Sequence, residues 1–246
     1  MFGLEGMRVL ITGAGGGIGT ALGAAFRAAG ARVIAADREP GADLVFDLAD
    51  AAATASALAA LLAQGDAPDI VVANAGWTRA ETFADLTTDS FDAELSINLS
   101  GAWRLLDPLL PAMKARGGGA ITFVASVNAL LHYGNPAYSA AKAGMLALMR
   151  GIAVEWGAGG IRANAVCPGS VLTPAWDHRL KRDPGLAAKV LAHYPLGRLA
   201  TPQEVANAVL FLSSPLAASI SGAALPVDAG LSAGNLGFFR DVLGAQ

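Results

Sequence analysis

The run Val9-Leu10-Ile11-Thr12-Gly13-Ala14-Gly15-Gly16-Gly17-Ile18-Gly19 decides the fold of this chain. Its first residues are typical of a buried strand, and a helical pattern follows the glycines. A strand that passes through a glycine-rich turn into a helix N-terminus builds a pyrophosphate site, because the backbone can approach the phosphates and free N–H groups attract the anion. A glycine cluster can also be only a tight turn, but this position between a strand and a helix favours nucleotide binding.

Asp37 indicates which nucleotide the site prefers. It ends a second predicted strand, residues 32–36, about twenty residues past the glycine turn, where a carboxylate binds the adenosine ribose hydroxyls. The same carboxylate would repel a 2′-phosphate. Arg38 could pair with such a phosphate, but Gly16 offers no cation inside the glycine loop to help it. The sequence therefore favours NAD, with NADP the less favoured cofactor.

The spacing of Tyr138 and Lys142 predicts acid–base chemistry. Residues at i and i+4 of a helix lie on the same face, so the phenol and the ammonium would be neighbours. A free tyrosine ionises near pH ~10, and a nearby positive charge would lower its pKa toward that of a useful general base. Ser126 could hold a substrate oxygen beside the phenol. Such a pair also occurs on solvated helix faces, so the rest of the chain decides between the two interpretations.

Several motifs in the same order make the sequence similar to the short-chain dehydrogenase/reductase family, in its single-domain version, from Val9 to about Gly230. The matching residues are Thr12, Gly13, Gly17 and Gly19, then Asn74, Ala75 and Gly76, then Asn98, Ser126, Tyr138 and Lys142, and finally Pro168, Gly169 and Thr173. The resemblance implies that Lys142 also holds the nicotinamide ribose. It further implies that Asn98 anchors a water that relays the proton from Lys142.

The resemblance also implies which residues bind the cofactor and how the chains assemble. The implied cofactor-binding residues are Gly13, Gly15, Gly17, Ile18, Gly19, Asp37, Arg38, Asp47, Leu48, Asn74, Ala75, Gly76, Tyr138, Lys142, Pro168, Gly169, Val171 and Thr173. Members of the family form homodimers and homotetramers through two long helices, so we expect a homo-oligomer. The segments 88–113 and 138–156 would supply its contact faces.

Residues 173–200 break the regular pattern of strands and helices, as a substrate lid does. Trp176 and His178 in this segment are expected to contact substrate, as are Trp77, Asn128, Ser126 and Tyr138. The cations Arg179, Lys181 and Arg182 fit an anion site or, equally well, a solvated helix face.

Composition limits the class of protein. The chain has 246 residues, 54% of them hydrophobic, and a formal charge of −3 without a block of like charges, so we expect no nucleic-acid surface. The start lacks the apolar stretch of a signal peptide, and no segment provides the ~20-residue apolar span of a membrane helix. We therefore expect a cytoplasmic protein that does not contact membranes. No cluster has metal-ligand spacing, so no metal is expected, and Cys167 fits a core thiol.

The order of elements predicts the fold class. Strands are expected at 8–12, 32–36, 43–46, 69–73, 120–125, 161–166 and 223–227, and helices at 17–29, 50–63, 88–113, 138–156 and 202–213. Strands that alternate with helices indicate a parallel sheet covered on both faces. We therefore predict an α/β protein with a Rossmann-type, doubly wound parallel sheet of about seven strands. One NAD(P)-binding domain would span residues 1–246.

The motifs predict hydride transfer between nicotinamide and a secondary alcohol. A polyol, a sugar or a small hydroxy compound is the first expectation for the substrate, because NAD suits oxidation and the predicted lid is polar. A 3-oxoacyl thioester reductase is the near alternative, and it would normally use NADPH and offer a basic surface to an acyl carrier. A non-catalytic dinucleotide sensor or scaffold is the third, and the intact Ser126, Tyr138 and Lys142 argue against it.

Overall fold

The computed structural model describes residues 2–79, 82–174, 176 and 184–244. Its strands form one seven-stranded sheet in the order β3-β2-β1-β4-β5-β6-β7, and every neighbouring pair is parallel. The strands are β1 Arg8–Thr12, β2 Arg32–Asp37, β3 Leu44–Val45, β4 Ile70–Ala73, β5 Gly119–Val124, β6 Ile161–Pro168 and β7 Ala224–Val227. The predicted Rossmann-type fold is confirmed.

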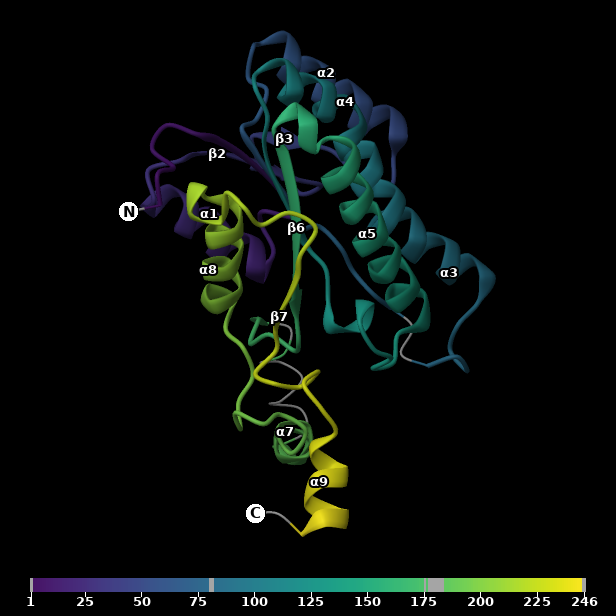
Figure 1. Ribbon diagram of the computed structural model, residues 1–246. Helices are drawn as coiled ribbons and strands as arrows, with labels where there is room; N and C mark the ends of the chain where they lie inside the picture. The colour runs from purple at the N-terminus through teal and green to yellow at the C-terminus, as the bar shows by residue number, and fades with distance from the viewer. Residues whose placement is uncertain (1, 80–81, 175, 177–183, 245–246) are drawn as a thin grey trace.

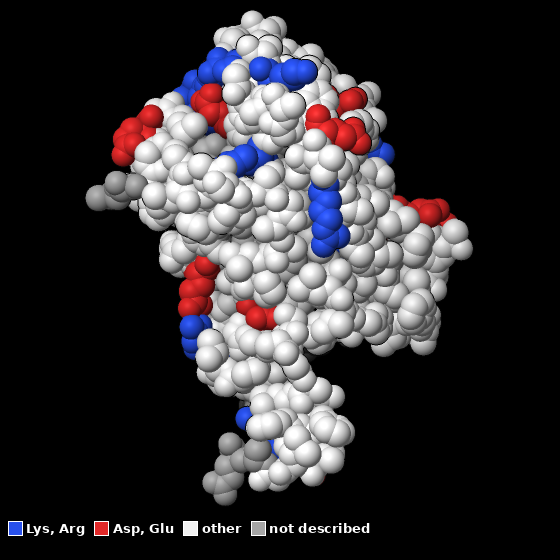
Figure 2. Space-filling model, viewed as in Figure 1, with Lys and Arg blue, Asp and Glu red and all other residues white. Residues whose placement is uncertain are grey.

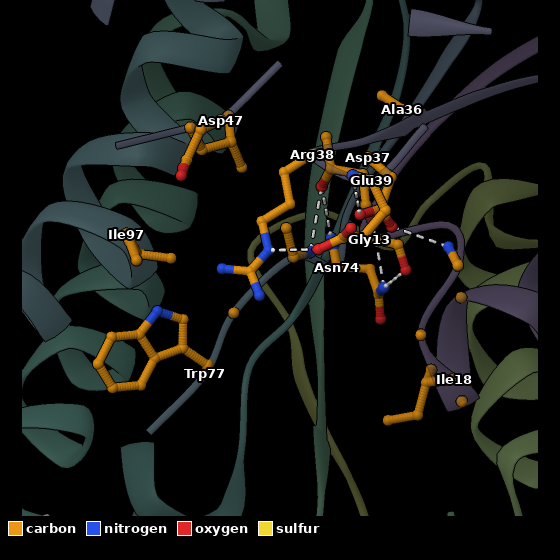
Figure 3. A pocket seen from close by; sticks show the side chains of 18 of the residues that line it. Gly13, Ile18, Ala36, Asp37, Arg38, Glu39, Asp47, Asn74, Trp77 and Ile97 are labelled. Atoms are coloured by element: carbon orange, nitrogen blue, oxygen red, sulfur yellow. Dashed lines mark hydrogen bonds and ion pairs between the residues drawn. The ribbon is translucent and has the colours of Figure 1, made fainter. Parts of the chain in front are cut away.

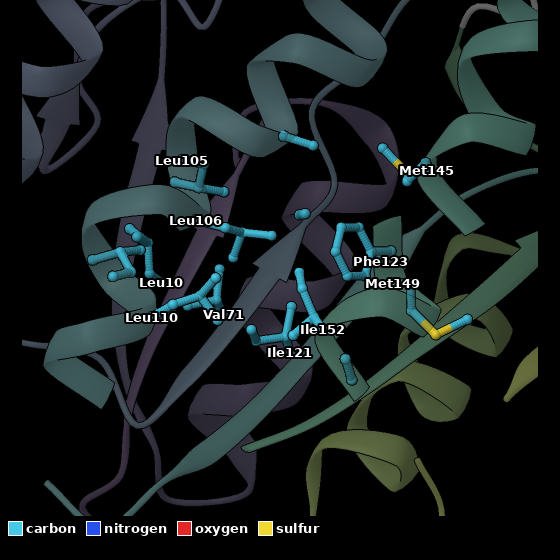
Figure 4. Packing of buried hydrophobic residues seen from close by; sticks show 14 of the residues in the cluster. Leu10, Val71, Leu105, Leu106, Leu110, Ile121, Phe123, Met145, Met149 and Ile152 are labelled. Atoms are coloured by element: carbon cyan, nitrogen blue, oxygen red, sulfur yellow. The ribbon is translucent and has the colours of Figure 1, made fainter. Parts of the chain in front are cut away.

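Helices cover both faces of the sheet (Figure 1). One face carries α1 (Gly17–Ala28) and α8 (Pro202–Ser213), and the other carries α2 (Ala51–Ala63), α4 (Gly101–Ala115) and α5 (Pro136–Glu155). Because side chains alternate along a strand, each strand contributes to two cores. In β1, Leu10 packs into the cluster under α4 and α5 (Figure 4), while Val9 and Ile11 pack into the cluster under α1 and α8.

The strand order places a crevice at the carboxyl ends of β1 and β4. From β1 the chain moves outward to β2 and β3, and then returns to the other side of β1 as β4. The connections after these two strands therefore leave in opposite directions, which is the arrangement at which open α/β sheets bind ligands. The glycine turn follows β1 and Asn74 follows β4, so both lie at this crevice.

The predicted helix 88–113 is wrong as one continuous element. The structure has α3 (Thr88–Leu95), a π-helical turn (Ser96–Ser100) and then α4. In the turn, Gly101 N–H donates to Ser96 O, five residues back. Asn98 explains part of the change, because its side-chain Nδ2 donates to Glu94 O at 2.9 Å and competes for the carbonyl that an α-helix would use at that point. Such π turns often mark functional sites.

Two helices were not predicted, and one starts early. Helix α5 begins at Pro136 rather than residue 138, because proline is well tolerated at the first helical position. Helix α7 (Pro184–Leu191) lies in the segment that the sequence left irregular, and α9 (Leu236–Leu243) lies close to the C-terminus. Figure 1 shows these two helices together, beyond the end of the main sheet.

The surface and the helices add three observations. On the face drawn in Figure 2, Lys and Arg are scattered among Asp and Glu rather than gathered into one patch. None of the helices in the described ranges is long and apolar enough to span a membrane. Within those same ranges, no group of three His, Cys, Asp or Glu side chains is arranged to hold a metal ion.

Candidate active site

A cavity of about 660 Å³ opens at the carboxyl ends of β1, β2 and β4 (Figure 3). It collects most of the predicted cofactor residues from segments far apart in the chain. They are Gly13, Gly15, Gly17, Ile18, Gly19, Asp37, Arg38, Asp47, Leu48, Asn74, Ala75, Gly76 and Thr173. We call it the cofactor cavity.

The glycines of the turn are required by close approach. A Cβ on Gly13, whose φ is +64°, would lie 2.9 Å from the Cα of Ala75, and a Cβ on Gly17 would lie 2.9 Å from Thr173 Cγ2. A Cβ on Gly19 would collide with the carbonyl oxygen of Gly13. Asn74 fixes the turn from the β4 side, because its Nδ2 donates to the carbonyls of Thr12 at 2.9 Å and Gly13 at 3.1 Å.

Asp37 joins the glycine turn to the end of β2. Its Oδ2 accepts the Gly15 N–H at 2.9 Å and its Oδ1 accepts the Glu39 N–H at 3.2 Å. Arg38 Nε lies 3.3 Å from Glu39 Oε1 in an exposed ion pair. Figure 3 shows the Arg38 side chain extending between Asp47 and Glu39 toward the side of the cavity where Trp77 lies.

These residues fit a dinucleotide of the NAD(P) type. Helix α1 begins at the cavity with glycine at its N-cap and no acidic residue in its first turn, so its N-terminus suits an anion. Asp37 supplies a carboxylate at the position that binds ribose hydroxyls.

A second cavity of about 450 Å³ adjoins the first and shares four lining residues with it: Ile18, Asn74, Gly76 and Thr173. We call it the substrate cavity. Of the predicted residues, it contains Ser126, Asn128, Tyr138, Lys142, Pro168, Gly169, Val171 and Trp176. His178, Arg179, Lys181 and Arg182 lie outside the described residues.

Ser126 follows β5 and caps a short 3₁₀ turn (Val127–Ala129). Its Oγ accepts the Asn128 N–H at 3.2 Å and donates to Asn128 Oδ1 at 3.3 Å. The amide of Asn128 is itself fixed, because Nδ2 donates to Gly134 O at 2.9 Å and to Ser139 Oγ at 3.1 Å. Asn128 therefore orients the serine hydroxyl through two of its own atoms.

Tyr138 and Lys142 lie side by side on α5, as predicted. Lys142 Nζ is 5.5 Å from the centroid of the Tyr138 ring and donates to Val124 O at 2.9 Å. Lys142 is 1% exposed. A Cβ on Gly76 would lie 3.3 Å from this Nζ, so the lysine also reaches the loop that follows β4.

The pKa of Tyr138 lies above its ordinary value in this structure, opposite to the direction expected from the charge of Lys142 alone. Burial raises the pKa of Tyr138 to about 12, and the hydrogen bond with Ser126 offsets only part of that rise. Burial also lowers the pKa of Lys142 to about 8, because desolvation disfavours the ammonium. The expectation considered only the charge of the lysine and omitted the low-polarity surroundings that both groups share.

Asn98 is fully buried in the π turn and holds the segment after β4. Its Nδ2 donates to Trp77 O at 2.7 Å, and its Oδ1 accepts the Trp77 N–H at 3.2 Å. Both hydrogen bonds fix the backbone beside Gly76, which lines both cavities.

Trp77 was predicted to contact substrate, but it lines the cofactor cavity instead. Asn98 fixes its backbone in that direction, and the Arg79 guanidinium lies 5.6 Å from the ring centroid. The sequence could not reveal this, because the direction of a side chain in a loop depends on contacts with distant segments.

The residues of the site that were not predicted include four with polar or charged side chains. Glu39 lines the cofactor cavity, Thr78 and Asn135 line the substrate cavity, and Glu94 is a fully buried carboxylate behind Thr78. Glu39 had a signal in the sequence, since it is a second acidic residue close to Arg38. The others had none, because each depends on contacts between segments.

The two ends of the segment that follows β6 lie next to each other. Val171 forms a parallel bridge with Ala200, and Leu172 N–H donates to Ala200 O at 2.9 Å. The two ends of the segment 173–199 are therefore joined at the wall of the substrate cavity. The role of this segment as a substrate lid stays a prediction.

Comparison with known proteins relates this geometry to chemistry. A family profile described as enoyl-(acyl carrier protein) reductase matches residues 13–232. An uncharacterized oxidoreductase of Schizosaccharomyces pombe is 38% identical over 97% of this chain and 96% of its own. A D-threitol dehydrogenase of Mycolicibacterium smegmatis is 37% identical over 93% of this chain and 94% of its own.

A solved structure is similar over almost the whole length. It is an oxidoreductase of the short-chain dehydrogenase/reductase family from Burkholderia thailandensis, 44% identical, with a TM-score of 0.90. The match covers 98% of this chain and 99% of the other.

Proposed function

The chain belongs to the short-chain dehydrogenase/reductase family, and we propose that it is an NAD-dependent oxidoreductase acting on a secondary alcohol or its ketone. One observation carries the proposal. The cofactor cavity and the substrate cavity share a wall at Gly76, next to Lys142, and Tyr138 and Ser126 line the substrate side. A nicotinamide and an alcohol could therefore meet beside an acid–base group.

NAD is the proposed cofactor because of the charges around Asp37. Glu39 pairs with Arg38, so the one cation of the cavity wall is partly neutralised in the described structure. Asp37 and Glu39 would both repel a 2′-phosphate, whereas Asp37 could accept hydrogen bonds from ribose hydroxyls. NADP is the less favoured cofactor on the same argument.

The proposed chemistry divides roles among four side chains. Bound NAD supplies the hydride acceptor at nicotinamide C4. Tyr138 takes the alcohol proton in oxidation and donates a proton in reduction. Ser126 holds the substrate oxygen, and Lys142 holds the nicotinamide ribose. Asn98 anchors a water that carries the proton onward from Lys142.

A polyol, sugar or small hydroxy compound is the proposed substrate. The substrate cavity is lined by hydroxyl and amide side chains that can bind hydroxyl groups, including Thr78, Asn128 and Asn135. The similarity to a D-threitol dehydrogenase supports this class. The name of the matching family profile supports the alternative, an acyl thioester reductase, which would favour NADPH.

The domain organisation, location and oligomeric state are proposed from the family. We propose one domain over residues 1–246, a cytoplasmic location, and a homodimer or homotetramer that associates through α4 and α5. Residues 173–200 would act as the substrate lid.

The test is a screen for NAD reduction over polyols, aldoses, hydroxy acids and 3-hydroxyacyl thioesters. The absorbance of the reduced nicotinamide measures the rate with each substrate. We expect the highest kcat/KM with a polyol or sugar and a lower kcat/KM with NADP. Activity restricted to thioesters with NADPH would replace the proposal with its alternative. Binding of NAD without turnover of any alcohol or ketone would favour a dinucleotide sensor.

A further inference from the structure

Glu94 is a buried carboxylate that the proposed chemistry does not use. It is 0% exposed on α3, and its Oε1 accepts the Thr78 hydroxyl at 3.2 Å and the Arg79 N–H at 2.8 Å. A carboxylate is costly to bury unless hydrogen bonds compensate for the lost water. Because two donors converge on Oε1, this oxygen acts only as an acceptor.

The acceptor at Glu94 sets the direction of a chain of hydrogen bonds. Thr78 gives its only hydroxyl proton to Glu94, so its oxygen can only accept from another group. That group is Asn135, whose Nδ2 donates to Thr78 Oγ1 at 2.8 Å. The amide orientation of Asn135 is therefore fixed, with its nitrogen toward Thr78.

Asn135 has an unusual backbone conformation for a helix N-cap. Its φ is 50° and its ψ is 65°, in the left-handed region, and it is the N-cap of α5. An N-cap asparagine normally accepts a backbone N–H with its side chain, but Asn135 makes no such bond. Its side chain turns to Thr78 instead, and in the described chain no residue donates to its Oδ1.

We propose that Asn135 Oδ1 accepts a hydrogen bond from a second hydroxyl group of the substrate. Asn135 and Thr78 both line the substrate cavity, and Asn135 lies three residues before Tyr138. The site then selects polyols over alcohols with a single hydroxyl. Thr78 and Glu94 act as positioning residues. They orient the Asn135 amide so that its oxygen, rather than its NH₂ group, faces the substrate. This inference rests on the proposed function.

The experiment compares four-carbon alcohols that differ in their number of hydroxyl groups: butan-2-ol, butane-2,3-diol and a tetritol. Asn135→Gly removes the side chain, and glycine accepts the left-handed backbone without strain. We expect this variant to lower the ratio of kcat/KM for diol to kcat/KM for butan-2-ol about five- to tenfold, the effect of one lost hydrogen bond. Thr78→Val should lower the ratio in the same direction, and Thr78→Ser should retain it.

Ala229→Gly is the matched control. Ala229 has a φ of 53°, is the other non-glycine residue with positive φ among those described, and does not line the substrate cavity. Its substitution makes the same kind of backbone change and should leave the ratio at the wild-type value.

The outcomes separate two failures. If Asn135→Gly and Thr78→Val lower kcat/KM for butan-2-ol and for the diol equally, Asn135 acts only on the backbone of α5, and the inference is overturned. The same holds if the ratio stays at the wild-type value in both variants. If the wild type oxidises none of the alcohols, the proposed function fails, and the inference fails with it.

Discussion

The cofactor cavity and the substrate cavity meet at Gly76 but are built largely from different parts of the chain. The glycines of the turn line the first, and a helix N-terminus opens into it. The residues that line the second come mainly from the loops after β4, β5 and β6 and from α5. The cofactor cavity therefore depends on close backbone contacts, while the substrate cavity depends on the orientation of individual side chains.

Tyr138→Phe should produce the largest effect and should separate the two cavities. We expect kcat to fall about 100- to 10,000-fold, the usual contribution of general acid–base catalysis, while NAD affinity stays close to wild type. Turnover with NAD and the best alcohol gives kcat, and calorimetric titration gives the affinity.

Lys142→Ala is the companion of that variant, because Lys142 contacts the Gly76 loop as well as Tyr138. Lys142→Ala should weaken NAD binding and also lower kcat. An unchanged NAD affinity would remove the proposed role of Lys142 in holding the ribose. A kcat for Tyr138→Phe close to wild type would show that another group moves the proton.

Burial of Tyr138 predicts a steep dependence of oxidation on pH. Its pKa is raised to about 12, so the phenolate that accepts the alcohol proton is scarce at neutral pH. The phenolate fraction should grow about tenfold per pH unit, so kcat/KM for oxidation should rise with that slope between about pH 6 and pH 8. Reduction uses the protonated phenol and should stay level over the same range.

The pH profile also tests whether Lys142 lowers the pKa of Tyr138. The window ends near pH 8, where burial places the pKa of Lys142 and the lysine begins to lose its charge. A profile for oxidation that is already level at pH 7 would mean that the Tyr138 pKa falls far below 12 when substrate and cofactor are bound. The original expectation for Lys142 would then hold for the reacting complex.

Asp37→Ser should change cofactor choice at the first cavity only. Removing the carboxylate removes its repulsion of a 2′-phosphate, so the preference for NAD should narrow by about tenfold. Asp37→Asn is the matched control for shape, since it removes the charge and keeps an oxygen near Gly15 N–H. The measurement is kcat/KM for NAD and NADP in each variant. A wild type that already prefers NADP would show that Arg38 dominates the site.

The cofactor cavity was the more predictable of the two for a physical reason. The residues of the glycine turn and Asp37 owe their roles to local sequence, namely a strand, a tight turn and a strand end. Close contacts at Gly13 and Gly19 are what such a turn requires, and the structure shows them. The parallel direction of the strands followed from the alternation of strands and helices.

The substrate cavity was less predictable because its geometry depends on contacts between segments. Glu94 looks like an exposed charge on a short helix, yet it is buried behind Thr78. The π turn at Asn98 arises from a side chain that competes with the backbone, which no apolar periodicity reveals. Asn135 adopts a left-handed conformation just before a proline, where sequence alone indicates only a helix start.

Glu39→Gln should give the smallest effect and tests the finest difference in the cofactor cavity. Glu39 Oε1 lies 3.3 Å from Arg38 Nε, and both side chains are more than half exposed. An exposed pair of this kind contributes about 0–1 kcal/mol, so releasing Arg38 to meet a 2′-phosphate should narrow the NAD preference only about two- to fivefold. The hydrogen bond from Glu39 to Asp37 is donated by the backbone N–H of Glu39 and survives the substitution.

Glu155→Gln is the matched control, because Glu155 is exposed at the end of α5. This substitution changes the net charge equally and should leave the ratio of kcat/KM for NAD and NADP unchanged. If Glu39→Gln instead strengthens the preference for NAD, then Glu39 does not restrain Arg38, and Asp37 alone sets the choice of cofactor.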